Sequence, residues 1–341
     1  RTPGLSPETT DAAFLGDHPD IPPYVAQEGD ERPELTAKIE ETMGWIMTAT
    51  SEPEELTEDR EKILSVIASR PDLGAASNEE LVSRARSMSP LIREFFEPYY
   101  IYGTAASVGP GILAELLAEV DPSLPGRLIT GLGGIDSAPP SHELWSLSRT
   151  VSSSETLTNA FEGGMESLRE RLEASDEGNA FLSALGDFIS EHGARGPGEW
   201  DARSATWEIN PDVTFAAVDA MRHADESLSP DNRHLAAVQI RENAEREARD
   251  ALAGSDEALS TLEMALRVCK IFIPTRERTK LTEMLAVHEI RLPMYELGNR
   301  MAKSGILQKP QDVFLLLDSE IDAFIADPEG MKDIITARSE D

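Results

Sequence analysis

Apolar residues recur at helical spacing along most of the chain. In the segment ELTAKIEETMGWIMTAT, Leu35, Ile39 and Met43 lie about 3.6 residues apart, which predicts an amphipathic helix. The segment TEDREKILSVIAS repeats this spacing, and Thr57 is its expected N-cap. No stretch longer than about five residues alternates between apolar and polar positions, as a half-buried strand would. The pattern therefore predicts a mostly α-helical fold.

Proline and glycine divide the longer periodic stretches. Residues 77–120 are predicted to form two or three helices, with breaks near Pro98 and at Gly109–Pro110. A long periodic stretch runs from about residue 276 to residue 304 and predicts a further helix. The C-terminal end is expected to hold two short helices and a buried apolar run, Val313–Leu317.

Two turn-rich segments interrupt the predicted helices. The stretches 121–141 and 192–212 combine glycine, proline and polar residues, a composition typical of loops. Helices are expected between them, near 142–175 and 177–192. Both segments therefore mark places where the chain changes direction.

The domain organisation follows from these boundaries. Residues 1–33 are rich in proline, glycine and acids, and are predicted to form an irregular entry segment. Residues 34–341 are predicted to form a single large helical domain, in which 121–141 is the place where two subdomains would meet. A chain of 341 residues is long enough for one large or two ordinary domains.

The chain is strongly acidic, with 63 Asp and Glu against 31 Lys and Arg and a net charge of −32. Neither nucleic acid nor an anionic membrane is expected as a partner, because both are bound by basic surface. No apolar run approaches the roughly 20 residues that span a bilayer. The single cysteine, Cys269, lies among apolar residues and is expected to be a small core residue, which suits a cytoplasmic protein.

Common nucleotide- and metal-binding motifs are absent from the sequence, which has no Walker loop, Rossmann fingerprint, HExxH or CxxC. The six histidines show no metal-ligand spacing, so no metal site is predicted. Candidate chemistry is therefore sought in local clusters of charged and aromatic residues.

Positive charge gathers in the segment KIFIPTRERTK, where Glu277 is the only acid. Arg276 and Lys280 are four residues apart, so in a helix both lie on one face. An Arg fork beside a Lys point charge can hold a phosphoryl group in transit, because that group carries negative charge on its oxygens. The alternative is the start of a surface helix with ordinary charge pairs, although cations in a first turn oppose the helix dipole.

The second candidate cluster lies in the glycine-rich segment 192–212, which holds Arg195, Glu199 and Asp201. Its glycines permit tight turns and close approach of a ligand. Glu199 or Asp201 could orient a guanidinium or accept a proton from an attacking hydroxyl. The alternative is a structural loop whose acids pair with Arg195 or Arg203.

Aromatic residues cluster in the segment FFEPYYIY. We expect them to line a site for a flat apolar ligand, since buried tyrosine hydroxyls need partners and aromatic side chains commonly line ligand cavities. The alternative is packing in the hydrophobic core. The candidate substrate-binding residues are Phe95, Phe96, Tyr99, Tyr100 and Tyr102.

Two of these segments resemble a known family. The stretch FISEHGARGPGEWDARSATWEINPD resembles the pattern F-L-x-x-Y-G-H-R-G-x-x-E-x-D…P-x-W. The stretch from 276 to 321 (RERTKLTEM…DVFLLLDSEI) resembles R-E-x-x-K…L-G-x-x-L-x-x-x-G-x-L…D-V-F-x-L. Both patterns belong to phosphoenolpyruvate synthase-like proteins, between their ATP-grasp domain and their swivelling phosphohistidine domain. Rifampin phosphotransferase and phenol-phosphorylating synthases are the relevant relatives, and the resemblance covers about residues 181–321.

The resemblance implies a function and its parts. In this family ATP phosphorylates a histidine on a mobile domain, which carries the phosphoryl group to an acceptor hydroxyl. The chain would be the acceptor-binding part of such a dikinase-type phosphotransferase. It would bind no cofactor itself, and ATP and Mg²⁺ would be used by a partner ATP-grasp domain or subunit. Its other partners would be the phosphohistidine domain and a small aromatic alcohol.

Site residues follow from the same resemblance. The R-E-x-x-K pair falls on Arg276 and Lys280, and the loop pattern falls on Arg195, Glu199 and Asp201. The sequence departs from the pattern in two places. Ala194 stands where the family has histidine in G-H-R, and His192 stands where it has the preceding tyrosine. The general base would then be another group, His192 or Glu199.

The family's phosphohistidine motif, T-x-x-G-G-x-x-S-H, is not found in the chain. In ITGLGGIDSAPPSH, Thr130 and Gly133–Gly134 fit it, but Ala138 follows where histidine is required, and His142 comes too late. This segment is interpreted as a turn. A complete catalytic cycle therefore requires donor domains from elsewhere in a longer polypeptide or from a partner subunit.

The favoured acceptor is a phenol or alkylphenol, because of the aromatic segment, in a protein of aromatic catabolism. One alternative is the corresponding domain of a rifamycin-type antibiotic phosphotransferase. Another is a non-catalytic helical binding protein that has lost the chemistry, which Ala194 would suit but the joint presence of Arg276, Lys280 and Glu199 would not.

Overall fold

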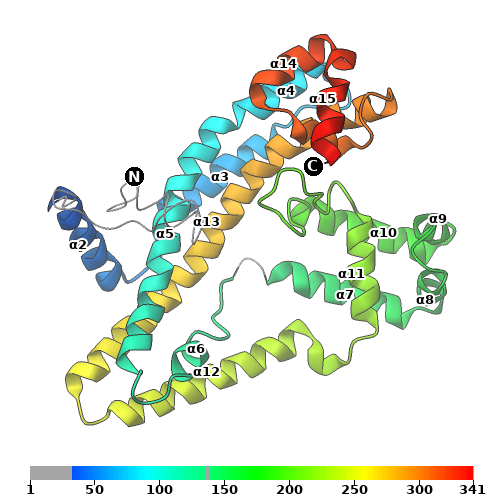
Figure 1. The fold of residues 1–341 in the computed structure, drawn as a ribbon. Coiled ribbons are helices and arrows are strands. Elements are labelled where there is room, and N and C mark those ends of the chain that lie inside the picture. The colour runs from blue at the N-terminus through cyan, green and yellow to red at the C-terminus, as the bar shows by residue number, and fades with distance from the viewer. Residues whose placement is uncertain (1–32, 136–137, 341) are drawn as a thin grey trace. The chain divides into compact units, whose positions relative to one another are not determined.

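The computed structural model of the chain describes residues 33–135 and 138–340, which fold into helices joined by loops (Figure 1). No strand occurs in these two ranges, which confirms the predicted mostly-α fold. No helix within them is long and apolar enough to cross a membrane. The elements are α2 (Pro33–Thr48), α3 (Glu55–Ala68), α4 (Asn78–Ser87), α5 (Ser89–Leu116), α6 (Leu124–Leu128), α7 (Pro139–Ser153), α8 (Glu155–Glu162), α9 (Leu168–Glu173), α10 (Asp176–His192), α11 (Asp212–Arg222), η1 (Glu226–Leu228), α12 (Pro230–Leu252), α13 (Asp256–Lys303), η2 (Pro310–Leu315), α14 (Asp318–Ala326) and α15 (Pro328–Glu340).

The helices form two compact units. The first unit comprises the described residues up to Pro53 together with Glu97–Gly133 and Gln239–Arg276. The second unit comprises Glu54–Phe96, the described residues of 134–238, and those from Glu277 onward. The predicted entry segment 1–33 lies, apart from Pro33, outside the described residues.

The core of the first unit is built from α5, α6, α12 and α13. Leu113, Leu124 and Leu262 are fully buried there, and α6 lies beside α12 (Figure 1). A Cβ atom at Gly109 would lie only 2.5 Å from the Cys269 Sγ atom, so α5 and α13 touch where glycine leaves room. Cys269 is buried, as predicted, and burial raises the pKa of its thiol to about 12. That thiol is therefore a packing group.

Helix α5 continues where the sequence predicted breaks. It runs unbroken from Ser89 to Leu116 with Pro98 and Pro110 inside it. A proline in a helix costs about 3 kcal/mol, because it removes a donor and crowds the preceding turn. Phe95 and Leu113, which are buried on either side of the prolines, supply packing that outweighs this cost.

Helix α13 likewise extends well beyond the predicted helix. It begins at Asp256, has 48 residues, and passes through Pro274 and Pro293. Arg276 therefore lies in the interior of the helix, where the end of the helix dipole has little effect. The expectation of a cationic first turn was wrong, and the charge of this segment has to be explained by side-chain contacts.

Among the described residues, the second unit has two large apolar clusters besides a small one around Ile63, Phe95 and Ala194. One joins α7 to α11 and contains Phe161, Phe181 and Phe215. The other joins α4, the C-terminal part of α13, α14 and α15, which also lie together in Figure 1. In the predicted apolar run, Val313 is buried but Leu317 is 61% exposed, because η2 ends before it.

Candidate functional site

The predicted loop between α10 and α11 folds back on itself and lies against α13. The Trp207 N–H donates to the Arg195 carbonyl at 2.9 Å, and the Glu208 N–H donates to the Gly193 carbonyl at 3.0 Å. Gly198 has φ +70°, and a Cβ atom there would lie 2.7 Å from Ser204 Oγ. Glycine is therefore required for the turn that presents the following residue, Glu199.

Arg291 of α13 holds this loop against the helix through hydrogen bonds. Its side chain is 0% exposed, and its guanidinium donates to the backbone carbonyls of Glu199 at 2.7 Å, Asp201 at 3.1 Å and Ala202 at 3.2 Å. The Tyr295 hydroxyl, one turn further along, donates to the Arg203 carbonyl at 2.8 Å. Buried carbonyl groups need such donors, so the loop conformation depends on α13.

Glu199 joins two cations at the centre of the loop. Its Oε1 atom lies 2.6 Å from Lys280 Nζ, and its Oε2 atom accepts a hydrogen bond from Arg195 Nε at 2.7 Å. The glutamate is buried, and the Lys280 side chain is 28% exposed. The sequence placed Arg195 and Glu199 in one cluster and Lys280 in another, and the structure brings the three together; the Arg195–Glu199 pair is also the one that the structural alternative named.

The protonation state of Glu199 follows from these contacts. Burial alone would raise the pKa of its carboxyl group, but hydrogen bonds and charges from Lys280 and Arg195 together hold the pKa below its ordinary value. Glu199 is therefore a carboxylate at neutral pH with both oxygens engaged. Such a group positions cations well and accepts protons poorly.

A cavity of about 200 Å³ opens beside Arg195. Its polar lining comes from Arg60, Arg195, His192 and one carboxylate, Glu191, and Leu281 of α13 contributes to its apolar side. Ala194, which replaces the histidine of the family pattern, also lines the cavity and is 7% exposed. The small side chain leaves space at this position, and the nearby cations suit an anionic group.

His192 lies at the end of α10 and forms a group that the sequence did not reveal. Its Nε2 atom is 3.0 Å from Glu143 Oε1 on α7, and Glu191 is its chain neighbour. One donor atom from each of these three residues lies within 4.8 Å of the others, so the group has the ligand types and spacing for a divalent cation. Glu143 is 49 residues away in sequence, and no local spacing rule detects such a pair.

Asp201 and Arg276 occupy different surroundings from Glu199. The Asp201 carboxylate is exposed and accepts from the Arg203 N–H at 2.9 Å, which closes a turn of the loop. Arg276 is exposed on α13, one helical turn before Lys280, and is the last residue of the first unit. The helical spacing that the sequence predicted between Arg276 and Lys280 is present.

The five aromatic candidates divide between the two units. Phe95 is buried in the second unit with Ile63, and the adjacent Phe96 is 48% exposed. Tyr102 is buried in the first unit, where its ring lies 6.4 Å from that of Phe272. Tyr99 and Tyr100 are half-buried in α5. None of the five lines the cavity beside Arg195.

An ionic network supports the far end of the loop. Glu208 lies 2.8 Å from His288 Nε2 and 3.0 Å from Arg70, and Arg70 also binds the buried carboxylate of Glu289, which Arg84 contacts at 2.7 Å. Burial lowers the pKa of His288, although Glu208 opposes this shift. These residues were not singled out from the sequence, because their partners lie on distant elements.

Comparison with known proteins gives a family. The family described as "Rifampicin phosphotransferase fourth domain" matches residues 98–277. This range is more than half of the chain and includes the loop with Arg195 and Glu199, and it ends three residues before Lys280.

Curated relatives are longer proteins. The chain is 24% identical over 196 residues to "Uncharacterized phosphotransferase YvkC" of Bacillus subtilis, which covers 56% of the chain and 23% of that protein. It is 26% identical over 218 residues to "Uncharacterized protein Rv2047c" of Mycobacterium tuberculosis and to "Uncharacterized protein Mb2073c" of Mycobacterium bovis, covering 60% of the chain and 22% of each. The chain thus spans less than a quarter of the length of these relatives.

Proposed function

Since the chain belongs to the family of the rifampicin phosphotransferase fourth domain, we propose that it is the acceptor-binding part of a dikinase-type phosphotransferase. The observation that supports this role most strongly is the contact of Lys280 and Arg195 with the two oxygens of buried Glu199, beside a cavity that two arginines line. The name of the Bacillus relative, a phosphotransferase, agrees with it.

The residues have distinct roles in the proposed reaction. Lys280, with Arg276 one turn earlier on α13, stabilises the negative charge on the oxygens of the transferred phosphoryl group. Arg195 lines the cavity and adds a guanidinium that can bind phosphate oxygens through two donors. Glu199 fixes the direction of both Lys280 and Arg195, so it is a positioning residue. Asp201 supports the loop that carries Arg195 and Glu199.

His192 is the best candidate for the general base. It lines the cavity, and Glu143 holds its Nε2 atom, which leaves Nδ1 to accept a proton. In the transfer step the acceptor oxygen forms a bond to phosphorus, the phosphorus–nitrogen bond of the donor phosphohistidine breaks, and the hydroxyl proton moves to His192. Glu199 is less suited to this role because both of its oxygens bind cations.

The proposed acceptor is a phenol or another small aromatic alcohol. The sequence predicted aromatic contacts for its ring in α5, but none of those residues lines the cavity beside Arg195, so the apolar lining residues Ala194, Leu281 and Leu285 are the proposed contacts there. The second candidate acceptor is a rifamycin-type antibiotic, which the description of the matched family favours. The donor phosphohistidine and the ATP-grasp domain that charges it with ATP and Mg²⁺ are proposed partners, and the proposed location is the cytoplasm.

Reconstitution tests this function. The chain is mixed with ATP-grasp and phosphohistidine domains of a family member, ATP, Mg²⁺, and a panel of phenols, alkylphenols and rifamycins, and phosphate esters are measured by mass spectrometry. We expect ester formation from at least one acceptor class, and a loss of about 100-fold in Lys280→Ala.

Lys303→Ala is the matched control, because Lys303 is an exposed lysine on the same helix outside the site. It should retain wild-type turnover. Absence of any ester with the wild-type chain, or equal turnover in Lys280→Ala and Lys303→Ala, would contradict the proposal and favour a non-catalytic binding protein.

A further inference from the structure

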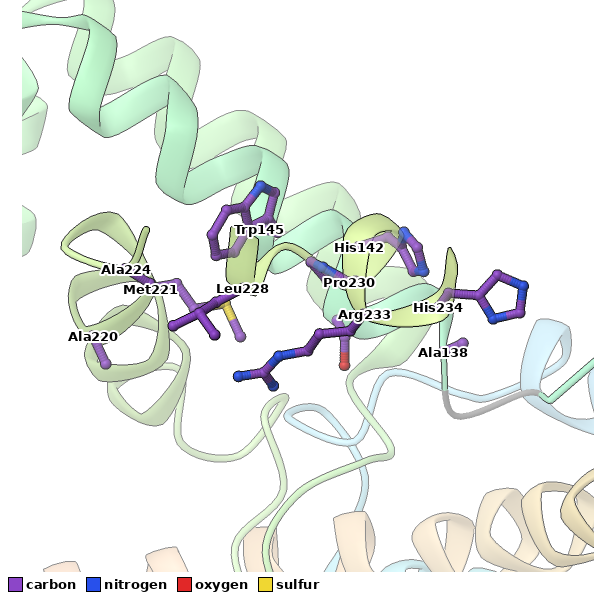
Figure 2. A pocket seen from close by; sticks show the side chains of 11 residues that line it. Ala138, His142, Trp145, Ala220, Met221, Ala224, Leu228, Pro230, Arg233 and His234 are labelled. Carbon is purple, nitrogen blue, oxygen red and sulfur yellow. The ribbon is translucent and has the colours of Figure 1, made fainter. Parts of the chain in front are cut away.

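A second cavity lies in the second unit, between α7, the end of α11 and the start of α12 (Figure 2). Its volume is about 430 Å³, which falls within the range of small-molecule sites. Trp145, Met221, Leu228 and Pro230 give it an apolar wall. None of the residues assigned to phosphoryl transfer lines this cavity, so it needs a separate explanation.

Part of this wall is held in place by Arg149. Its guanidinium lies over the Trp145 ring, 4.2 Å from the ring centroid, and it also donates to the backbone carbonyls of Met221 and Ala224. This half-buried cation–aromatic contact and the two hydrogen bonds link α7 to the C-terminal end of α11. The tryptophan is fixed before any ligand arrives, which lowers the entropy cost of binding.

One cation on the cavity lining is available for a ligand. Within residues 33–135 and 138–340, the Arg233 guanidinium makes no hydrogen bond or ion pair, although the chain carries 63 acidic residues. In Figure 2 the Arg233 side chain extends toward the apolar lining residues, whereas the His234 ring points away from them. The nearby Asp231 carboxylate is paired with His142 Nδ1 at 3.2 Å. Arg233 therefore presents its donors beside an apolar wall.

We propose that this cavity binds a flat aromatic carboxylate, with the ring against Trp145 and Met221 and the carboxylate on Arg233. The carboxylate can accept two parallel hydrogen bonds from the guanidinium fork, which a lysine could not offer. The apolar wall takes the ring, whose burial supplies the larger part of the binding free energy. The site is independent of the proposed phosphoryl transfer, and binding there requires neither ATP nor a partner domain.

Isothermal titration calorimetry of the full chain with 1-naphthoate tests this assignment. We expect saturable binding to the wild-type chain at one site. The neutral 1-naphthamide should bind at least about tenfold more weakly, because it lacks the charge-assisted hydrogen bonds. Acetate should not compete, because a carboxylate without a ring gains nothing from the apolar wall. Equal binding of naphthoate and naphthamide, or no binding of naphthoate, would overturn the proposal.

Three variants locate the site. Arg233→Gln and Trp145→Leu should each weaken naphthoate binding about tenfold or more, and Arg233→Lys should show an intermediate affinity. Arg246→Gln, which removes an exposed arginine of α12 that does not line the cavity, should bind as the wild type does. Arg233 is exposed, so its variants should keep the wild-type melting temperature. Wild-type affinity in Arg233→Gln would place the ligand elsewhere and refute the site.

Discussion

At the scale of the residue, two buried glutamates of the second unit have opposite electrostatic surroundings. Glu199 has a cation on each oxygen, and the pKa of its carboxyl group lies below the ordinary value. Glu283 is 1% exposed, and its Oε2 atom has no hydrogen-bond partner among the described residues. Burial raises the pKa of Glu283 to about 7. The two residues therefore affect stability in opposite directions as pH changes.

Replacing Glu199 should remove stability that exists only when its carboxyl group is ionised. Its folded-state pKa is depressed, so the unfolded state binds more protons at low pH, and the contribution is full above about pH 4.5 and is lost as pH falls. We expect Glu199→Gln to be on the order of 3 kcal/mol less stable at pH 7, with a gap that narrows below about pH 4.5. Urea unfolding across pH measures this, with exposed Glu119→Gln as the control. If the difference in unfolding free energy between the wild type and Glu199→Gln does not change with pH, the charge of Glu199 is not its cause.

Replacing Glu283 should have the opposite pH dependence. Its folded-state pKa is raised to about 7, so the native state holds a proton that the unfolded state has released, and wild-type stability falls as pH rises from about 4.5 to 7. Glutamine does not titrate, so the stability of Glu283→Gln should not fall as pH rises through this range. Relative to wild type, the variant should gain roughly 3 kcal/mol between pH 5 and pH 8 in the same urea experiment. If the unfolding free energies of the wild type and Glu283→Gln change in parallel between pH 5 and pH 8, Glu283 is not buried as a neutral acid.

At the scale of the element, α13 is the helix on which the candidate site is built. It supplies Lys280, and its buried Arg291 donates to three backbone carbonyls of the loop between α10 and α11, those of Glu199, Asp201 and Ala202. Its other half packs against α5 in the first unit, through Gly109 and Cys269. The loop therefore takes its conformation from a residue of α13 that is 89 to 92 positions away in sequence. Substitutions in α13 should change the conformation or the mobility of the loop.

Arg291→Met should loosen the loop selectively. Methionine fills similar space but donates no hydrogen bond, so the carbonyls of Glu199, Asp201 and Ala202 lose their partner. Hydrogen exchange should increase in residues 199–206, while the core of α7 and α11 stays protected.

Arg300→Met is the matched control for this experiment. Arg300 also lies on α13 but donates to the carbonyls of Leu73, Gly74 and Ala76. Its replacement should increase exchange near residues 73–76 and leave the loop unchanged. Identical exchange patterns in the two variants would mean that neither arginine acts locally.

At the scale of the whole molecule, the chain carries a net charge of −32 on two helical units. Many of its arginines and lysines are already paired with carboxylates, so the excess acids repel one another across the surface. Such repulsion acts against the compact state and is screened by salt. The few cations around Lys280 are thus local features on a molecule whose overall field is negative.

Salt should therefore stabilise the chain. The Debye length falls from about 10 Å at 0.1 M to about 3 Å at 1 M, so the melting temperature should rise with sodium chloride, most steeply at low concentrations. Calorimetry in a salt series measures this, and sucrose at matched osmolality is the control for solvent exclusion. A melting temperature that falls with added salt would show that attractive ion pairs, such as those of Arg70 and Glu289, outweigh the net repulsion.

Much of the secondary structure was predictable, because helical periodicity and turn composition are local properties. The mostly-α fold, the loop at 192–212 and the buried Cys269 were confirmed. The breaks predicted near Pro98 and at Gly109–Pro110 were wrong, and so was the helix start predicted near residue 276, since local rules assign proline a cost but contain no information on the packing that offsets it.

The sequence by itself determined which residue types were available for the candidate site and, through two ordered motifs, the family. Only the tertiary structure decided which of them meet: Glu199 with Lys280, His192 with Glu143, and Arg291 with the loop. The two residues of each pair are 49 to 92 positions apart in sequence. Their contacts depend on how helices pack, and packing is set by the sum of many distant apolar contacts that no short motif contains.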